Sequence, residues 1–289
     1  MKKICFITTS RADFGTIDEL VQTLIMRKNF IVQLIVSGSH ISRIFGNTVK
    51  EIKNKRNCTI VKTKILYKNN SPRGIAIAFA DCVKKISNIL SNLKPDIFVV
   101  FGDRYEMLAA TVAAYILRIP IAHIAGGEKT VGSIDEGFRH SISKLSNLHF
   151  PIANQYRKRL IQLGENPKTI FNYGSLNVTK IKNNDYLTKS VLEKKLKFKF
   201  LRKNLVITYH PDALNGGKSL KNLSIVLNSI KNFKNTGIII TSPNADAYGI
   251  LMINKIKSFI KKNKLKNFLF VKSLGSKMYL SLLKIVDGV

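Results

Sequence analysis

Short apolar runs of strand length alternate along the chain with longer segments in which apolar residues recur at helical spacing. The short runs are apolar throughout, which is typical of parallel strands covered by helices on both faces. The predicted strands are residues 3–9, 31–37, 60–66, 96–102, 119–125, 148–153, 169–174, 204–210, 237–243 and 267–272. The predicted helices include residues 16–28, 74–93, 105–118 and 247–262. The pattern therefore predicts an α/β fold.

This alternation weakens over residues 175–190, which are polar, rich in asparagine and only weakly periodic. A break of this kind marks the connection between two separately folded parts of a chain. We therefore predict two α/β domains in series, residues 1–179 and residues 180–289.

The charge balance is strongly basic, with 48 Lys+Arg against 17 Asp+Glu and a formal net charge of +31. A basic surface attracts polyanions, so a nucleic-acid partner has to be weighed. Most of the excess is lysine scattered beside asparagine and isoleucine, the chain has no tryptophan, and arginines do not cluster with aromatic residues. We therefore expect a solvated lysine-rich surface and a small anionic ligand, without a nucleic-acid partner.

Three cysteines, Cys5, Cys58 and Cys82, are widely spaced and form no CxxC pair. This argues against a disulfide framework or a structural zinc site and fits a reducing compartment. We expect the first residues to form a strand and not a signal peptide, and no apolar run is long enough to span a bilayer. We expect a soluble cytoplasmic protein. GxGxxG and HExxH are both absent, so we expect no cofactor and no metal ion.

Polar side chains follow several of the predicted strands. Open parallel sheets bind ligands beyond the carboxyl ends of their strands, so residues at these positions converge on one crevice. Those that follow a strand in this way are Arg11, His40, Asp103, Arg104, His123, Gly126, Gly127, Glu128 and His210. Purely structural roles remain open for some of them: Asp103 can be a helix N-cap, Arg11 a surface residue and His210 a packed strand-end histidine.

Residues 122–140, AHIAGGEKTVGSIDEGFRH, hold the densest group of candidates. A helix is predicted from near Ser133, and Ser133 with Glu136 matches a capping box, which gives Glu136 a structural role. The next residues of this helix have two readings. Asp135 and Arg139 are four apart and can form a solvated pair, but a helix N-terminus also binds anions. The Gly126–Gly127 pair would let the backbone approach a ligand closely.

The order of these motifs resembles the hydrolysing UDP-N-acetylglucosamine 2-epimerase family, bacterial enzymes of sialic- and legionaminic-acid biosynthesis. The resemblance runs from residue 4 to about residue 286. It implies two Rossmann-like domains of the glycosyltransferase-B type with the active site between them. The motifs that carry it are SRADFG (10–15), GSHIS (38–42), FGNT (45–48), GDRYEMLAA (102–110), HIAGGE (123–128), IDEGFRHSISKLSNLHF (134–150) and YHP (209–211).

The resemblance also implies a reaction. A nucleoside-diphospho-N-acetylhexosamine would lose its C2 proton and its nucleoside diphosphate, and water would then add to the resulting glycal. Asp103, Asp135 and His210 fall on the family's catalytic positions. The implied substrate or nucleotide contacts are Arg11, His40, Arg104, Gly126 and Gly127, with Arg139 and His140 supporting the pocket.

Two departures from the family pattern affect these expectations. Many relatives have a glutamate directly after the His-Ile pair, where this chain has Ala125, so Glu128 becomes a candidate catalytic substitute. Relatives also continue beyond the equivalent of residues 282–289, so we expect the second domain to be incomplete and to expose unpaired sheet edge. A non-hydrolysing epimerase and an inactive nucleotide-sugar-binding remnant remain alternative functions, and a homodimer is the expected assembly.

Overall fold

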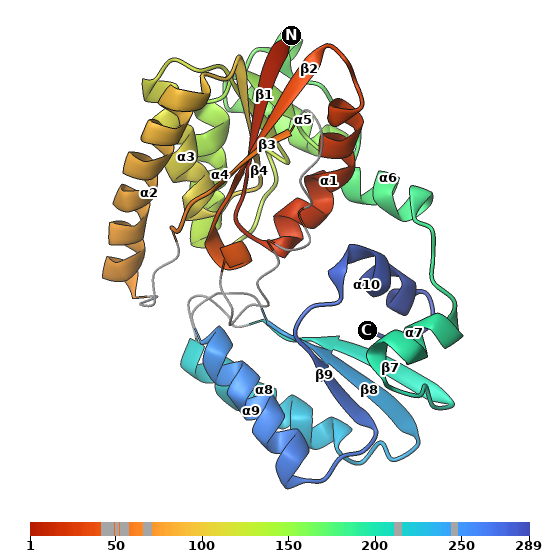
Figure 1. Ribbon diagram of the computed structural model, residues 1–289. Helices are drawn as coiled ribbons and strands as arrows, with labels where there is room; N and C mark the ends of the chain where they lie inside the picture. Colours follow the sequence, from red (N-terminus) through yellow and green to blue (C-terminus); the bar gives the residue numbers. More distant parts are fainter. Residues whose placement is uncertain (42–48, 50–51, 53–57, 66–70, 211–215, 244–247) are drawn as a thin grey trace. The chain divides into compact units, whose positions relative to one another are not determined.

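The computed structural model describes residues 1–41, 49, 52, 58–65, 71–210, 216–243 and 248–289, without the side chain of Arg11. The chain divides into two compact units, Met1–Ser42 with Asn47–Lys182 and Asn183–Val289. Each unit is built on a parallel β-sheet with helices on both faces (Figure 1). Within the described residues, no helix combines the length and the apolar character needed to cross a bilayer.

The first unit contains a six-stranded sheet in the order β3-β2-β1-β4-β5-β6. The order reverses between β1 and β4, the kind of switch point at which open α/β sheets bind ligands. Its strands are β1 (Lys2–Thr8), β2 (Phe30–Val36), β3 (Cys58–Lys62), β4 (Ile97–Phe101), β5 (Ile121–Ile124) and β6 (Leu148–Phe150). Its helices are α1 (Arg11–Ile25), α2 (Pro72–Leu93), α3 (Tyr105–Ile116), α4 (Ile134–Lys144), α5 (Asn154–Gln162) and α6 (Leu176–Asn183), with the short 3-10 helices η1 (Gly38–Ile41) and η3 (Pro167–Thr169).

Two apolar layers hold this sheet in place. Along β1 the buried side chains alternate, so that Cys5 and Ile7 pack in one layer and Phe6 in the other. Helices α2 and α3 cover the first layer side by side, whereas α1 covers the second (Figure 1). Because both faces are covered, the strands are apolar throughout, as their sequence predicts.

The second unit contains a three-stranded parallel sheet, β7-β8-β9. Its strands are β7 (Lys203–Thr208), β8 (Thr236–Thr241) and β9 (Phe268–Val271), and its helices are α7 (Lys189–Leu196), α8 (Gly216–Ile230), α9 (Gly249–Lys262) and α10 (Gly275–Leu283). One core lies beneath α8 and α9, and the other beneath α7 and α10. The outer side of β7 pairs with the last residues of the chain, where the Val206 N–H donates to the Gly288 carbonyl at 3.0 Å and the Asp287 N–H donates to the Asn204 carbonyl at 2.8 Å. That pairing reduces the exposed sheet edge that the sequence led us to expect.

Most predicted elements occupy their expected positions, with one clear exception. Residues 169–174 form no strand, although Ile170 makes an isolated bridge to His149 and the Phe171 N–H donates to the His149 carbonyl at 2.8 Å. The chain then turns away through Gly174, whose φ of +85° lies in the left-handed region. Leu66 and Ala247, at the ends of two predicted elements, lie outside the described residues, as does the predicted motif at 45–48.

Candidate active site

A cavity of about 300 Å³ lies in the first unit, at the carboxyl ends of β4 and β5. Three charged side chains, Asp103, Glu128 and Arg139, line it together. The remaining wall is apolar or neutral and comes from α1, the two strand ends and the segments at 152 and 175–177. These residues are Thr16, Phe101, Gly102, Ile124, Ala125, Ile152, Ser175, Leu176 and Asn177. The cavity therefore offers one cation and two carboxylates to a ligand.

Arg139 is the centre of this charged group. It projects from α4, is only 4% exposed, and pairs with Asp103. Its guanidinium also donates to the Glu128 carbonyl oxygen at 3.1 Å and to the Thr130 hydroxyl at 2.9 Å. The arginine thus joins the end of β4 to the loop before α4. Asp103 is not the N-cap of α3, because that helix starts at Tyr105 and its cap is Arg104.

Glu128 brings a second carboxylate to the same cavity. Burial raises the pKa of Glu128, Asp103 raises it further, and Arg139 opposes both effects. A carboxyl group whose pKa is raised has a higher affinity for a proton and is suited to general acid–base work. The cavity therefore combines a carboxyl group of raised pKa with a buried cation.

The hydrogen bonds that cap the N-terminus of α4 differ from the sequence prediction. Ser133 is the N-cap, but its hydroxyl accepts from the Asp135 N–H at 3.2 Å. The Glu136 carboxylate reaches back to the Thr130 N–H at 2.9 Å. The predicted Ser133–Glu136 capping box is therefore wrong, because the glutamate satisfies a donor three residues before the cap. Asp135 is half-buried in the first turn of α4, outside the cavity lining.

The two glycines of the loop have a packing role. A Cβ on Gly126 would lie 2.9 Å from both His123 Nδ1 and Ser143 Oγ. A Cβ on Gly127, whose φ is +79°, would lie 2.5 Å from the Tyr156 carbonyl oxygen. Both positions exclude larger residues because the protein itself fills the space. Ligand contact by their backbones stays a prediction.

His123 fixes the base of the cavity from inside β5. The side chain is fully buried, its Nε2 lies 2.9 Å from the Gly102 carbonyl oxygen, and its Nδ1 lies 3.0 Å from the Ser143 hydroxyl. Burial lowers the pKa of His123 to about 3, although the Gly102 contact opposes this shift. The ring is therefore neutral at physiological pH, and its contact with the Gly102 carbonyl holds the residue that precedes Asp103.

This shift predicts a dependence of stability on pH. The pKa of His123 is about 3 in the folded protein, against 6.5 for an ordinary histidine. As the pH falls, this ring is therefore protonated in the unfolded chain before it is protonated in the folded protein. The free energy of unfolding should therefore fall by about 2 kcal/mol between pH 6.5 and pH 4.5. Urea titrations followed by circular dichroism at several pH values would measure it.

The variant His123→Gln provides the control, because glutamine does not titrate in this range. Its stability at pH 7 should be lower, but the slope between pH 6.5 and 4.5 should be shallower than that of the unmodified chain. The pKa of His149 is also lowered by burial, so a residual slope of the same sign is expected. An unchanged slope in His123→Gln would contradict the assignment.

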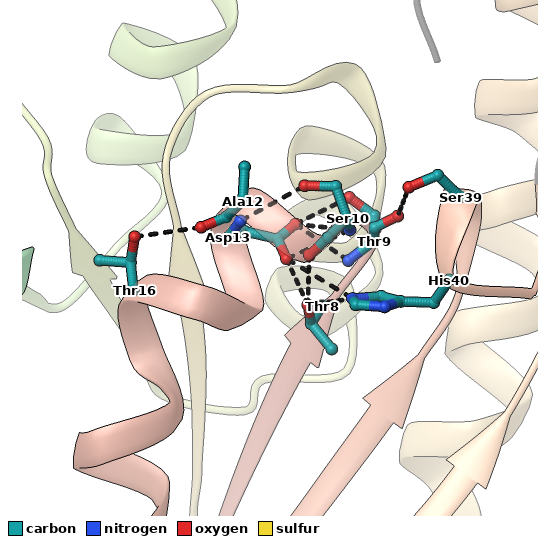
Figure 2. A network of polar contacts seen from close by, with 8 residues as sticks. All are labelled: Thr8, Thr9, Ser10, Ala12, Asp13, Thr16, Ser39 and His40. Atoms are coloured by element: carbon teal, nitrogen blue, oxygen red, sulfur yellow. Dashed lines mark hydrogen bonds and ion pairs between the residues drawn. The ribbon is translucent and has the colours of Figure 1, made fainter. Parts of the chain in front are cut away.

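A second polar network joins the end of β1 to the start of α1 (Figure 2). Asp13, 6% exposed, accepts hydrogen bonds from the Thr8 hydroxyl, from the Thr9 N–H and hydroxyl at 3.0 Å each, and from the Ser10 N–H at 3.0 Å. His40 Nε2 lies 2.9 Å from the Thr8 hydroxyl and 3.8 Å from the Asp13 carboxylate. Ser10 and Asp13 form the capping box of α1.

This network changes what can be expected of the β1 edge. His40 is 1% exposed, and its ring faces Thr8 and Asp13 (Figure 2). The Thr9 and Ser10 N–H groups, which an anion would use here, already bind Asp13. The geometry gives His40 a positioning role, and its contact with substrate stays a prediction. Arg11 is the first residue of α1, and its side chain lies outside the described structure.

The other predicted site residues lie outside the cavity lining. Arg104 pairs with the buried Glu106 at 3.2 Å. His140 Nε2 lies 3.7 Å from Glu136, and its buried Nδ1 has no hydrogen-bond partner among the described residues. His210 is exposed after β7 in the second unit, and Pro211 of its motif lies outside the described residues.

Some cavity residues carried no signal in the sequence. Thr16 on α1 lies 2.9 Å from the Asn177 side chain, although 161 residues separate them along the chain. Neither belongs to a motif, and Asn177 lies in the polar segment that we assigned to a domain boundary. Pairings of this kind depend on the sheet order, which periodicity does not provide. Within the described residues, no three His, Cys, Asp or Glu side chains gather in a metal-binding arrangement.

Comparison with known proteins places the chain in a family. The family model described as UDP-N-acetylglucosamine 2-epimerase matches residues 22–289. A GDP/UDP-N,N'-diacetylbacillosamine 2-epimerase (hydrolyzing) from Campylobacter jejuni is 40% identical over 288 residues, which cover 100% of this chain and 74% of that protein. Polysialic acid biosynthesis protein P7 from Escherichia coli is 35% identical over 292 residues, with coverage of 100% and 73%.

A solved structure confirms the fold. The crystal structure of UDP-GlcNAc 2-epimerase from Neisseria meningitidis bound to UDP-GlcNAc superposes with a TM-score of 0.75 at 17% identity. The superposition covers 98% of this chain and 76% of that one. The family match spans most of the sequence, and the first relative is similar over the whole of it. The chain belongs to the UDP-N-acetylglucosamine 2-epimerase family.

Proposed function

We propose that this protein is a hydrolysing nucleotide-sugar 2-epimerase acting on a nucleoside-diphospho-N-acetylhexosamine. The observation that carries the proposal is the cavity in which Asp103, Glu128 and Arg139 meet. The similarity to a hydrolysing 2-epimerase along the whole chain supports it. Removal of an unactivated C–H proton requires a carboxylate, and departure of a diphosphate is stabilised by a cation. The cavity has both.

The reaction proceeds in two stages. In the first, the C2 proton passes to a base, its electron pair forms the C1=C2 double bond, and the C1–O bond breaks with its electrons on the nucleoside diphosphate. In the second, water adds its oxygen to C1 and a proton returns to C2 on the opposite face. The products are a free N-acetylmannosamine-type sugar and a nucleoside diphosphate. Asp135 and His210 remain proposed catalytic residues.

The substrate class follows from the relatives. The Campylobacter jejuni protein is named for both GDP- and UDP-linked N,N'-diacetylbacillosamine, and the Neisseria meningitidis structure holds UDP-GlcNAc. We therefore propose a UDP- or GDP-linked sugar with an N-acetyl group at C2 as the substrate. A buried arginine beside two carboxylates suits a ligand that carries both phosphates and an acetamido group.

A nucleotide-release assay tests this function. The chain is incubated separately with UDP-N-acetylglucosamine and with GDP- and UDP-linked N,N'-diacetylbacillosamine, and free nucleoside diphosphate is measured. We expect release from at least one substrate, and the variant Asp103→Asn should lower it by about a hundredfold or more. The loss is expected because Asp103 supplies one of the cavity carboxylates and pairs with Arg139.

The products separate the alternatives. Free nucleoside diphosphate with a free sugar supports the hydrolysing reaction. An epimerised sugar that is still attached to its nucleotide would show that the chain catalyses the non-hydrolysing reaction. Binding of the nucleotide sugar without turnover would show that the chain is an inactive nucleotide-sugar-binding protein. Release that is unaffected by Asp103→Asn would place the chemistry outside this cavity.

A further inference from the structure

The cavity has an uncharged stretch of lining to which the reaction outlined above gives no role. It is formed by α1 and the start of α6, and it contains Thr16, Leu176 and Asn177. The Thr16 hydroxyl donates to the Asn177 side-chain oxygen, Oδ1, at 2.9 Å, and it lies 3.1 Å from the Ala12 carbonyl oxygen (Figure 2). The Asn177 side chain therefore lies at the cavity with its oxygen already bound.

The amide nitrogen of Asn177, Nδ2, keeps two N–H donors for a ligand. It has no hydrogen-bond acceptor within the described part of the chain, and the residue is exposed. Its position is fixed, because α6 is held to α1 at a second point, where Lys180 Nζ donates to the Gly15 carbonyl oxygen. Asn177 thus presents an amide donor to the cavity from a defined place on its wall.

This arrangement matches an acetamido group. Such a group has a carbonyl oxygen that accepts a hydrogen bond and a methyl group that packs against apolar surface. Asn177 supplies the donor, and Leu176 and Ile152 supply apolar surface in the same lining. A phosphate is a poorer match, because phosphates bind most strongly to cationic side chains, and this stretch of the lining carries no charge.

We propose that Asn177 is a specificity-determining residue that donates a hydrogen bond from Nδ2 to the acetamido carbonyl of the sugar. Thr16 is its positioning residue, because the Thr16 hydroxyl fixes which end of the amide faces the cavity. The inference rests on the proposed function and names a contact that selects its substrate. A site that hydrogen-bonds one group of its substrate discriminates strongly against ligands that lack this group.

The variant Asn177→Leu tests the contact, because leucine has a similar size and no charge but donates no hydrogen bond. With the nucleotide sugar that the unmodified chain turns over, we expect kcat/KM for nucleotide release to fall about tenfold to a hundredfold. Thr16→Val keeps the shape of threonine and removes the hydroxyl, so it should cause a smaller loss of the same kind. Circular dichroism checks that each variant is folded.

Inhibition by the free nucleoside diphosphate provides a second readout. The UDP or GDP that the reaction releases has no acetamido group, so its inhibition constant should change by less than about threefold in Asn177→Leu. A residue that only fastened α6 to α1 would weaken both ligands together. Asn88→Leu is the matched control: Asn88 is exposed on α2, outside the cavity lining, and its replacement should leave kcat/KM unchanged.

The outcomes separate this contact from the function as a whole. An active parent chain with a normal kcat/KM in Asn177→Leu would overturn the role of Asn177 alone. An equal loss of affinity for the free nucleoside diphosphate would also overturn it, because Asn177 would then act only through the structure of the cavity. A normal kcat/KM in Thr16→Val would contradict the positioning role of Thr16. If the unmodified chain releases no nucleotide from any of the sugars, the proposed function fails and this inference falls with it.

Discussion

Replacing Arg139 with methionine is expected to lower the free energy of unfolding by about 3 kcal/mol and to reduce turnover at least about a hundredfold. Arg139 is almost fully buried and supplies N–H donors to Asp103, to the Glu128 carbonyl and to Thr130. Methionine fills a similar volume but donates nothing, so a carboxylate and a carbonyl lose their partner. Breaking a buried pair from one side leaves an uncompensated charge, which is the costly case. Urea unfolding and the nucleotide-release assay measure the two effects.

The partner residue provides the control for this prediction. In Asp103→Asn the charge that Arg139 compensates is removed, so adding Arg139→Met to that background should cost less than it does alone, by about 1 kcal/mol or more. Arg139→Lys keeps a positive charge but lacks the planar fork that reaches three acceptors, so it should recover only part of the stability. Strictly additive losses in the double variant would show that the pair is not coupled.

Asp13→Asn is expected to destabilise the first unit by about 3 kcal/mol at pH 7, although Asp13 is not among the residues that line the cavity. The Asp13 carboxylate accepts hydrogen bonds from the Thr8 hydroxyl, the Thr9 N–H and hydroxyl, and the Ser10 N–H, and His40 Nε2 lies 3.8 Å from it. An amide has one acceptor oxygen in place of two and carries no charge, so it cannot keep all of these charge-assisted hydrogen bonds. Chemical denaturation of the variant at pH 7 measures the loss.

The same carboxylate predicts a loss of stability in acid. Burial alone would raise the pKa of Asp13, but the nearby His40 and the hydrogen bonds from Thr8 and Thr9 together lower it below the ordinary 3.8. A lowered folded-state pKa means that the stabilisation is complete above about pH 4 and is lost as the pH falls further. The difference in stability between the unmodified chain and Asp13→Asn should therefore narrow below pH 4. A difference between these two proteins that stays constant from pH 7 to pH 3 would contradict this account of the Asp13 pKa.

Ser10→Ala, which removes only the N-cap hydroxyl of α1, should lower the free energy of unfolding by about 1 kcal/mol.

The sheet order explains how much of the site could be predicted. Asp103 and Glu128 were identified because each follows a strand, and strand ends converge in parallel sheets. Arg139 was found through the helix that begins near Ser133. Local patterns could not show that Arg139 turns to Asp103, because that choice depends on β4 and β5 lying side by side.

The capping-box error has the same origin. The spacing of Ser133 and Glu136 fits a capping box, but only the folded loop shows that the glutamate reaches Thr130. The packing role of Gly126–Gly127 was also hidden, because nothing in the sequence reveals that Ser143 and Tyr156 fill the space beside them. Contact of these two glycines with a ligand stays a prediction. Sequence periodicity identifies which face of an element is buried. It does not identify the neighbour that buries it.

The buried Asp13 has a consequence for how this protein handles phosphate. The N-terminal end of a helix carries a partial positive charge, which many α/β proteins use to hold a phosphate after their first strand. Here that charge is already neutralised by a carboxylate belonging to the helix itself. A phosphate approaching this end would meet a negative charge. The diphosphate of a nucleotide sugar must therefore be held by side-chain cations or by the start of another helix, even though the topology of the sheet resembles that of a dinucleotide-binding protein.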